Sequence, residues 1–123
     1  MTGSVATHVL TGLLHRWQRA FNEHKPAEIA SLFSRDALFQ GISPRLRRGP
    51  QEISEYYGRV TRGTTAQAKV LSAARLSHAV VHGFAEVTFT APNGDIHLIC
   101  LSIVAGQADG TWLIHQYHAA TRN

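Results

Sequence analysis

The 123-residue chain has a single cysteine, Cys100. One cysteine cannot form an internal disulfide or a thiolate-rich metal site, so we expect a reducing compartment and an inert, buried thiol. Residues 1–17 lack the basic leader of a signal peptide, and no apolar run is long enough to span a bilayer. These absences predict a cytoplasmic protein with no membrane partner.

Acidic residues are also scarce, with eight Asp and Glu against twelve Lys and Arg. Most of them fall at expected helix ends, exposed helix positions or turns. Glu86 is the exception, because it lies within the expected strand 80–89. The opposite face of that strand is plainer and more apolar, so we expect Glu86 and His82 to point outward. An inward Glu86 acting as a base against His118 is the alternative.

The basic residues do not predict a nucleic-acid partner. The densest run, 45-RLRR-48, is bracketed by Pro44 and Gly49, which are typical of a loop. A nucleic-acid surface would need more basic residues, with aromatic residues interleaved for stacking. Charged residues of this kind are usually solvated, so we expect an exposed loop.

The eight histidines are not spaced as metal ligands. His115 and His118 are three apart on an expected strand and therefore point to opposite faces. His78 and His82 share a face but lie roughly 13 Å apart at about 3.3 Å per residue, whereas zinc ligands lie within about 2.1 Å of the ion. A cross-strand pair of His97 and His115 is geometrically possible, but the sequence predicts neither a metal nor another cofactor.

The order of predicted elements is typical of an α+β domain over residues 1–123. Apolar residues at three- and four-residue steps predict a helix over 6–22. Further helices are predicted within 24–37, starting at Pro26, and over 50–60, with a short strand over 37–42 between them. Segments 68–91 (two strands turning near 76–79), 94–106 and 111–120 predict an antiparallel meander. Asn-Gly and Asp-Gly between the last three strands indicate hairpin turns.

Three motifs resemble the nuclear transport factor 2-like superfamily, in particular its SnoaL-like and steroid isomerase-like branch. They are 17-WQRAFNEHKPAEIASLFSRDALFQG-41, 49-GPQEISEYY-57 and 109-DGTWLIHQYHAAT-121, and together they cover the chain nearly end to end. The resemblance implies a cystatin-like cone, in which a curved antiparallel or mixed sheet wraps three helices and leaves a cavity at its wide end. It also implies frequent homodimerisation through the outer sheet face.

The last strand supplies the predicted polar residues of this cavity. Strict alternation places Trp112, Ile114, Gln116 and His118 on one face, and the positions of Trp112 and Ile114 pack on the helices in this superfamily. We therefore expect Gln116 and His118 to point into the cavity. His118 is the predicted acid–base group, and a rim histidine without chemistry is the alternative.

Aromatic residues are expected to complete the cavity. Tyr56 or Tyr57 would donate a hydroxyl hydrogen bond to a ligand, or would only pack between helix and sheet, and the sequence does not decide which of them faces inward. Trp17, Phe21 and Phe39 are expected to line the apolar floor. The carboxylate groups of the superfamily's isomerases and hydrolases have no counterpart here.

The predicted function is binding of a small hydrophobic molecule in an apolar cavity edged by His and Tyr, with isomerase-, cyclase- or dehydratase-like chemistry left open. The alternative is a non-catalytic module for homo-oligomerisation or partner binding. Residues 96–103 are apolar on both strand faces, which indicates that both are buried. We therefore expect a homodimer through the outer sheet face, with His97, His115 and Tyr117 at its rim.

Overall fold

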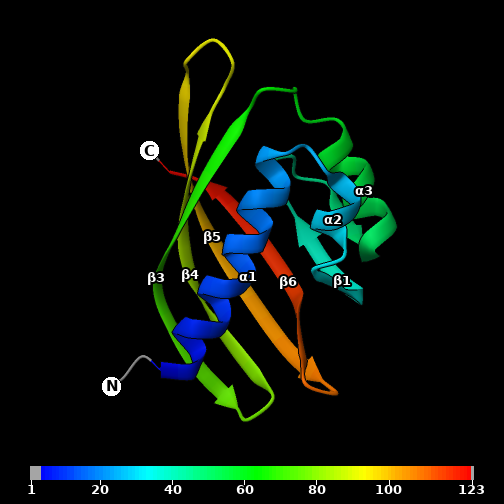
Figure 1. The fold of residues 1–123 in the computed structure, drawn as a ribbon, viewed down its shortest axis with the longest axis vertical. Helices are drawn as coiled ribbons and strands as arrows, with labels where there is room; N and C mark the ends of the chain where they lie inside the picture. The colour runs from blue at the N-terminus through cyan, green and yellow to red at the C-terminus, as the bar shows by residue number, and fades with distance from the viewer. Residues whose placement is uncertain (1–3, 123) are drawn as a thin grey trace.

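A computed structural model describes residues 4–122 of the chain. These residues form helices on one side of a sheet (Figure 1). In chain order the elements are α1 (Ser4–Asn22), α2 (Pro26–Ala30), β1 (Phe33–Gln40), β2 (Leu46–Arg48), α3 (Gly49–Gly58), β3 (Thr65–Ser77), β4 (Val80–Thr90), β5 (Ile96–Ala108) and β6 (Thr111–Thr121).

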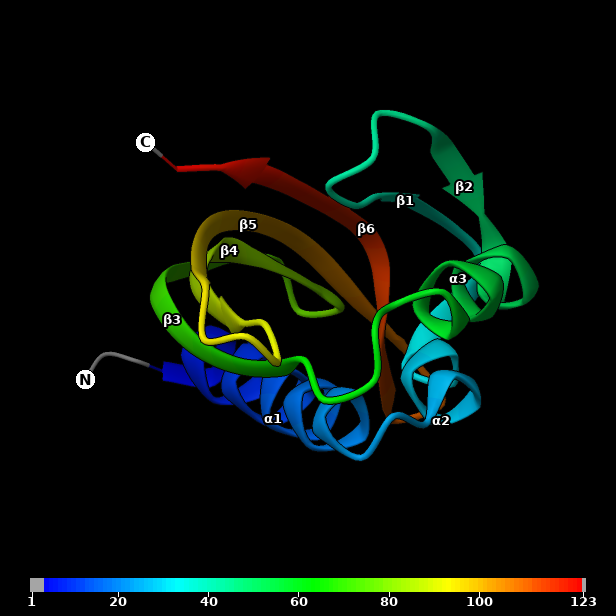
Figure 2. The ribbon, with the colours of Figure 1, turned by 90° about the horizontal axis from the view of Figure 1, so that it is seen from above.

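The strands form a single mixed sheet in the order β2-β1-β6-β5-β4-β3. Strands β3 to β6 form an antiparallel meander, whereas β1 pairs in parallel with β6. Seen from above, the strands curve around the side on which the helices lie (Figure 2). The α+β class and the meander are confirmed.

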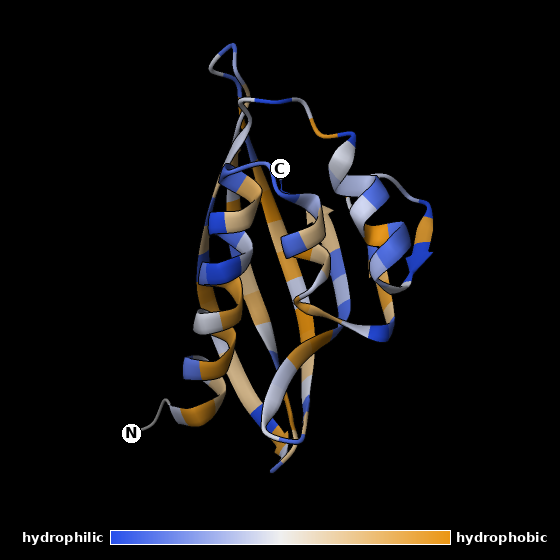
Figure 3. Cartoon of the chain, turned by 45° about the vertical axis from the view of Figure 1, so that its right-hand side comes forward, coloured by the Kyte–Doolittle hydropathy of each residue, from blue (hydrophilic) through white to orange (hydrophobic). Residues whose placement is uncertain are grey.

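The first helix, α1, crosses the concave face of the sheet and packs chiefly against β3. Its predicted apolar residues are all buried, and its other face is mostly polar, so hydrophobic and hydrophilic positions alternate along the helix (Figure 3). Burying one large apolar side chain contributes about 1.5–3 kcal/mol, so this face anchors the helix. The buried residues of α1 include Leu10, Leu13, Leu14, Trp17 and Phe21.

Within residues 4–122, no helix combines the length and the hydropathy needed to cross a membrane.

The second predicted helix is shorter than expected. Pro26 begins α2 as predicted, but the chain has entered β1 by Phe33. The backbone N–H of Ile114 in β6 donates a hydrogen bond to the carbonyl of Leu32 at 2.8 Å. Pairing with β6 therefore draws into the sheet a segment that its helical spacing alone assigned to the helix.

Both predicted hairpin turns are present. Asp109 and Gly110, which join β5 to β6, have φ values of 55° and 79°, as a two-residue type I′ turn requires. Gly94, with a φ of 95°, lies in the longer turn between β4 and β5. There the N–H of Ala91 donates to the carbonyl of Asp95 at 2.8 Å. These turns fix the register of the meander.

Candidate ligand-binding site

A bulge in β6 reverses the side-chain alternation of the last strand. The register between β5 and β6 shifts between Ile114 and Gln116, so His115 is an extra residue on the β6 side. Ile114 is buried before the bulge, and Tyr117 and Ala119 are buried after it. The C-terminal half of β6 therefore faces the opposite way to the one that strict alternation predicts.

The prediction that Gln116 and His118 point into the cavity is wrong. Both side chains are exposed on the outer face of the sheet. With Leu38 of β1 and Leu46 of β2 they line a groove of about 210 Å³. Because of the bulge, the inward position belongs to Tyr117, which is 4% exposed and therefore does not lie at the rim of the outer face as predicted.

A cavity of about 330 Å³ lies between the end of α3, the turn between β4 and β5, and the end of β6. This volume is within the range of small-molecule sites in proteins, roughly 300–1,000 Å³. Most of the lining is aromatic or aliphatic. The charged side chains among the lining residues are exposed, so they lie at the mouth of the cavity. The lining residues are Phe21, Gly41, Ile42, Tyr56, Tyr57, Arg59, Val60, Thr61, Thr64, Phe89, Ala91, His97, Tyr117 and Ala119.

A hydrogen bond connects the core to the wall of this cavity. The indole Nε1 of Trp17 donates to the hydroxyl of Tyr57 at 2.9 Å, and the hydroxyl of Tyr117 lies close enough to that of Tyr57 to raise its pKa. An indole N–H can only donate. Tyr57 therefore accepts from Trp17, and its own proton remains available to a neighbouring oxygen such as that of Tyr117. We infer that the Tyr117 hydroxyl is left to donate into the cavity.

The two buried hydroxyls stay neutral at physiological pH. Burial raises the pKa of Tyr57 well above its ordinary value of 10, and the neighbouring Tyr117 raises it further. Burial also raises the pKa of Tyr117, although the neighbouring Tyr57 hydroxyl partly offsets this effect. Removing a phenolate from water is unfavourable, so both groups keep their protons. The site therefore presents a neutral hydrogen-bond donor.

Tyr56 holds the loop between β1 and β2 against α3. Its hydroxyl accepts a hydrogen bond from the backbone N–H of Ile42 at 3.1 Å, and a side chain at Gly41 would collide with the same hydroxyl. The guanidinium of Arg47 lies 4.7 Å from the centre of the Tyr56 ring. Arg47 is only 9% exposed, so the prediction of a solvated loop is wrong here, because strand pairing and a cation–π contact cover this charge.

The predicted aromatic residues divide into lining and support. Phe21, Tyr56 and Tyr57 all line the cavity, so the two tyrosines are not alternatives. Trp17 and Phe39 are 0% and 1% exposed and pack against Tyr57 from behind the lining. They shape the cavity without forming its surface.

Sequence reasoning misses Arg59, His97 and Tyr117 as lining residues. The alternation of β5 contains the signal for His97, because His97 shares a strand face with the buried Ile99 and Leu101. The prediction that His97 lies at the rim of the outer face is therefore wrong. Arg59 is the C-cap residue of α3, so its placement depends on where that helix ends, and Tyr117 depends on the bulge.

Within residues 4–122, no carboxylate lines the cavity. Glu86 points outward, as predicted, and accepts a hydrogen bond from Arg122 at 2.6 Å. Cys100 lies on the same outer face and is half-buried, not fully buried as expected. His97 and His115 lie near opposite ends of the β5–β6 pair, so they do not form the cross-strand pair that the sequence permits.

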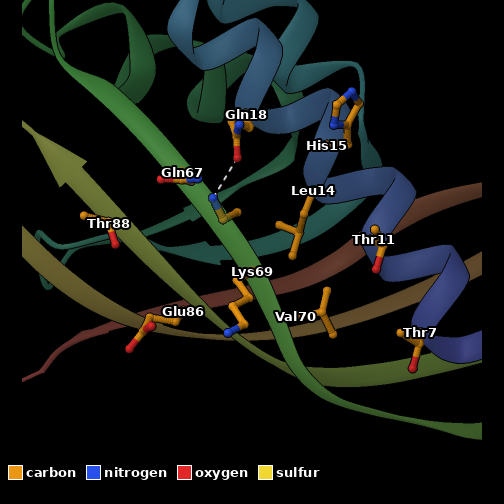
Figure 4. A pocket seen from close by; sticks show the side chains of 11 residues that line it. Thr7, Thr11, Leu14, His15, Gln18, Gln67, Lys69, Val70, Glu86 and Thr88 are labelled. Atoms are coloured by element: carbon orange, nitrogen blue, oxygen red, sulfur yellow. Dashed lines mark hydrogen bonds between the residues drawn. The ribbon is translucent and has the colours of Figure 1, made fainter. Parts of the chain in front are cut away.

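A wider depression, about 650 Å³, follows the edge strand β3 beside α1 (Figure 4). Its lining comes from both faces of that strand: Val70 faces α1, whereas Lys69 lies on the same side as Glu86. Gln18 of α1 accepts a hydrogen bond from the N–H of Ala68 at 2.7 Å, which covers part of the strand edge. The lining of this depression is mostly polar, whereas that of the smaller cavity is mostly apolar, so the smaller cavity is the candidate site.

No protein-family model and no curated protein matches the chain in sequence. Solved structures match it in fold. A domain of unknown function with a cystatin-like fold from Nostoc punctiforme PCC 73102 aligns with a TM-score of 0.83 at 16% identity, over 99% of this chain and 80% of that one.

Two further structures differ in the role that their names give them. A protein proposed to be a calcium/calmodulin dependent protein kinase II association domain from Xanthomonas campestris has a TM-score of 0.83 at 20% identity, over 99% of this chain and 91% of that one. A ketosteroid isomerase-like protein from Erwinia carotovora atroseptica SCRI1043 has a TM-score of 0.79 at 14% identity, over 94% and 95%. The predicted cystatin-like fold is confirmed.

The raised pKa values of Tyr57 and Tyr117 predict a loss of stability in alkali. Each group keeps its proton more tightly in the folded chain than in the unfolded chain. Raising the pH therefore destabilises the fold only above about pH 10, where the unfolded chain loses these protons. Above that pH, the free energy of unfolding should fall by up to about 1.4 kcal/mol per pH unit for each tyrosine. Urea unfolding at pH 9 and pH 11 measures this fall. The double variant Tyr57→Phe, Tyr117→Phe should lose it, and an equal fall in that variant would contradict the assignment.

Proposed function

We propose that the chain binds a small hydrophobic molecule in the cavity beside Tyr117. The observation that carries this proposal is the buried side chain of Tyr117 in the lining of a largely apolar space, next to the Tyr57 hydroxyl that accepts from Trp17. Packing alone would be served by Phe at position 117. A few placed polar groups within an apolar lining are typical of sites that orient a ligand. A carbonyl or hydroxyl oxygen of the ligand would accept the proton of the Tyr117 hydroxyl.

Isomerase-like chemistry in this cavity would also need a proton acceptor. The Erwinia neighbour is a ketosteroid isomerase-like protein, and Tyr117 would serve as the donor in such a reaction. Of the lining residues, His97 is of the type most often used for acid–base catalysis. We therefore propose His97, in place of the outward-facing His118, as the residue that would transfer a proton.

Filling the cavity should abolish ligand binding. In Ala119→Phe the new ring would occupy the space that a neutral probe such as 2-acetonaphthone fills in the wild type. At a probe concentration 100 times Kd, binding should stabilise the wild type by about 2.7 kcal/mol. Thermal unfolding with and without the probe measures this gain.

The matched control is Ala27→Phe, because Ala27 is exposed on α2, away from the cavity. This variant should be stabilised by the probe as much as the wild type is. Equal stabilisation of Ala119→Phe, or no stabilisation of the wild type by a panel of naphthyl ketones and alcohols, would contradict the proposal.

A second candidate function is homo-oligomerisation through the outer sheet face. Leu38, Phe84 and Leu98 are 46%, 55% and 43% exposed there, and Val104 on the same face is half-buried opposite Gln116. Large apolar side chains exposed on one face of a sheet can mark a protein interface. The Xanthomonas neighbour, proposed to be an association domain, supports the same role. We propose that a second copy of the chain covers this face while the cavity on the opposite face keeps its ligand.

Charge on this face should weaken self-association. In a two-fold dimer each substitution acts twice, and burying one Phe contributes about 1.5–3 kcal/mol. Phe84→Glu should therefore raise the dimer dissociation constant at least about tenfold, as measured by sedimentation equilibrium. Val5→Glu, at an exposed apolar position of α1, is the control that adds the same charge elsewhere. A wild-type chain that stays monomeric at every concentration would contradict the proposal.

A further inference from the structure

The mouth of the cavity is positively charged. Arg59 and His97 are exposed lining residues, and in the part of the chain that the structure describes no Asp or Glu joins them. The rest of the lining is apolar or carries uncharged hydroxyls. The electrostatic character of the mouth therefore comes from one guanidinium and one imidazole.

The guanidinium of Arg59 is not neutralised by the protein. Among residues 4–122, Arg59 forms no ion pair with a carboxylate. Glu55 precedes it by one helical turn but lies outside the lining. Near His97, the carboxylate of Asp95 accepts a hydrogen bond from Asn93 at 3.2 Å within the turn between β4 and β5. Arg59 is thus available to an anion from outside.

The cavity below this mouth suits an apolar body. Phe21, Val60, Phe89 and Ala119 form its walls, and about 330 Å³ is enough for a small ring system or a short alkyl chain. A guanidinium binds a carboxylate through two parallel hydrogen bonds, which are stronger than neutral ones. Apolar walls and a charged mouth together favour an amphipathic anion.

The position of α3 favours one negative charge over two. Arg59 follows the C-terminal end of α3 (Gly49–Gly58), where the helix dipole and the last carbonyl oxygens are negative. A phosphate would bring more negative charge close to the negative C-terminal end of α3, and only a single guanidinium would be available to compensate it. A carboxylate places less charge there and matches the fork of one arginine.

We propose that the ligand is a hydrophobic monocarboxylate. Its carboxylate pairs with Arg59 beside His97, and its apolar body lies between the walls formed by Phe21, Val60 and Phe89. This inference rests on the proposed ligand-binding function and adds the chemical class of the ligand to it.

The test compares an acid with its neutral isostere. Binding of 2-naphthylacetate and 2-naphthylacetamide to the wild-type chain is measured by isothermal titration calorimetry. The acid should bind at least about tenfold tighter than the amide, because a charge-assisted pair is the stronger one. Arg59→Gln should lower the affinity for the acid more than the affinity for the amide and so remove this preference, and Arg59→Lys should restore part of it.

The control is Arg62→Gln, which removes the same charge from an exposed residue outside the lining. It should keep the full preference for the acid. Arg59 also offsets the helix dipole, so its substitution can lower the stability of the fold, and thermal unfolding of each variant is recorded to measure this. The comparison of acid with amide on the wild type does not depend on any variant.

The outcomes separate the two proposals. Equal affinity of the wild type for acid and amide, or an undiminished preference in Arg59→Gln, overturns the monocarboxylate inference and leaves the ligand-binding function standing. If neither compound binds, and 2-acetonaphthone also fails to stabilise the wild type, both proposals fall.

Discussion

The extra residue at His115 is the constraint on which the site depends. A strand places successive side chains on opposite faces, so one inserted residue exchanges the faces of every position that follows. After the bulge, Tyr117 and Ala119 are buried on the helical side, and His118 faces outward. The cavity therefore receives a phenol and a methyl group where uninterrupted pairing would have placed an imidazole and an amide.

The aromatic core turns this orientation into a defined donor. Phe39 stacks on Tyr117 with ring centres 4.6 Å apart, and stacking of this kind adds to the free energy gained by burial alone. Trp17 can only donate, so the Tyr57 hydroxyl accepts this hydrogen bond and keeps its own proton to give. The polarity of the site is thus decided in the core, by a residue that does not line the cavity.

Sequence patterns predict this fold well where the structure is locally regular. The hairpin turns at Gly94 and Asp109, the apolar face of α1 and the outward direction of Glu86 each follow from local spacing. The predictions fail where contacts between segments distant in the chain determine the local structure. Pairing with β6 brings residues of the expected second helix into β1, and Tyr56 covers the charge of Arg47. The bulge at position 115 has no local sequence signal in this chain, so the inward residue of the last strand could not be predicted from alternation.

The orientation of the last strand can be observed directly by nuclear Overhauser contacts in solution. The ring protons of Tyr117 should show contacts to the rings of Phe39 and Phe33, whose centres lie 4.6 and 5.9 Å away. The ring of His118 should show none to these residues. Contacts from His118 to Phe39 or Trp17, with the ring of Tyr117 in solvent, would contradict the bulge and with it the site.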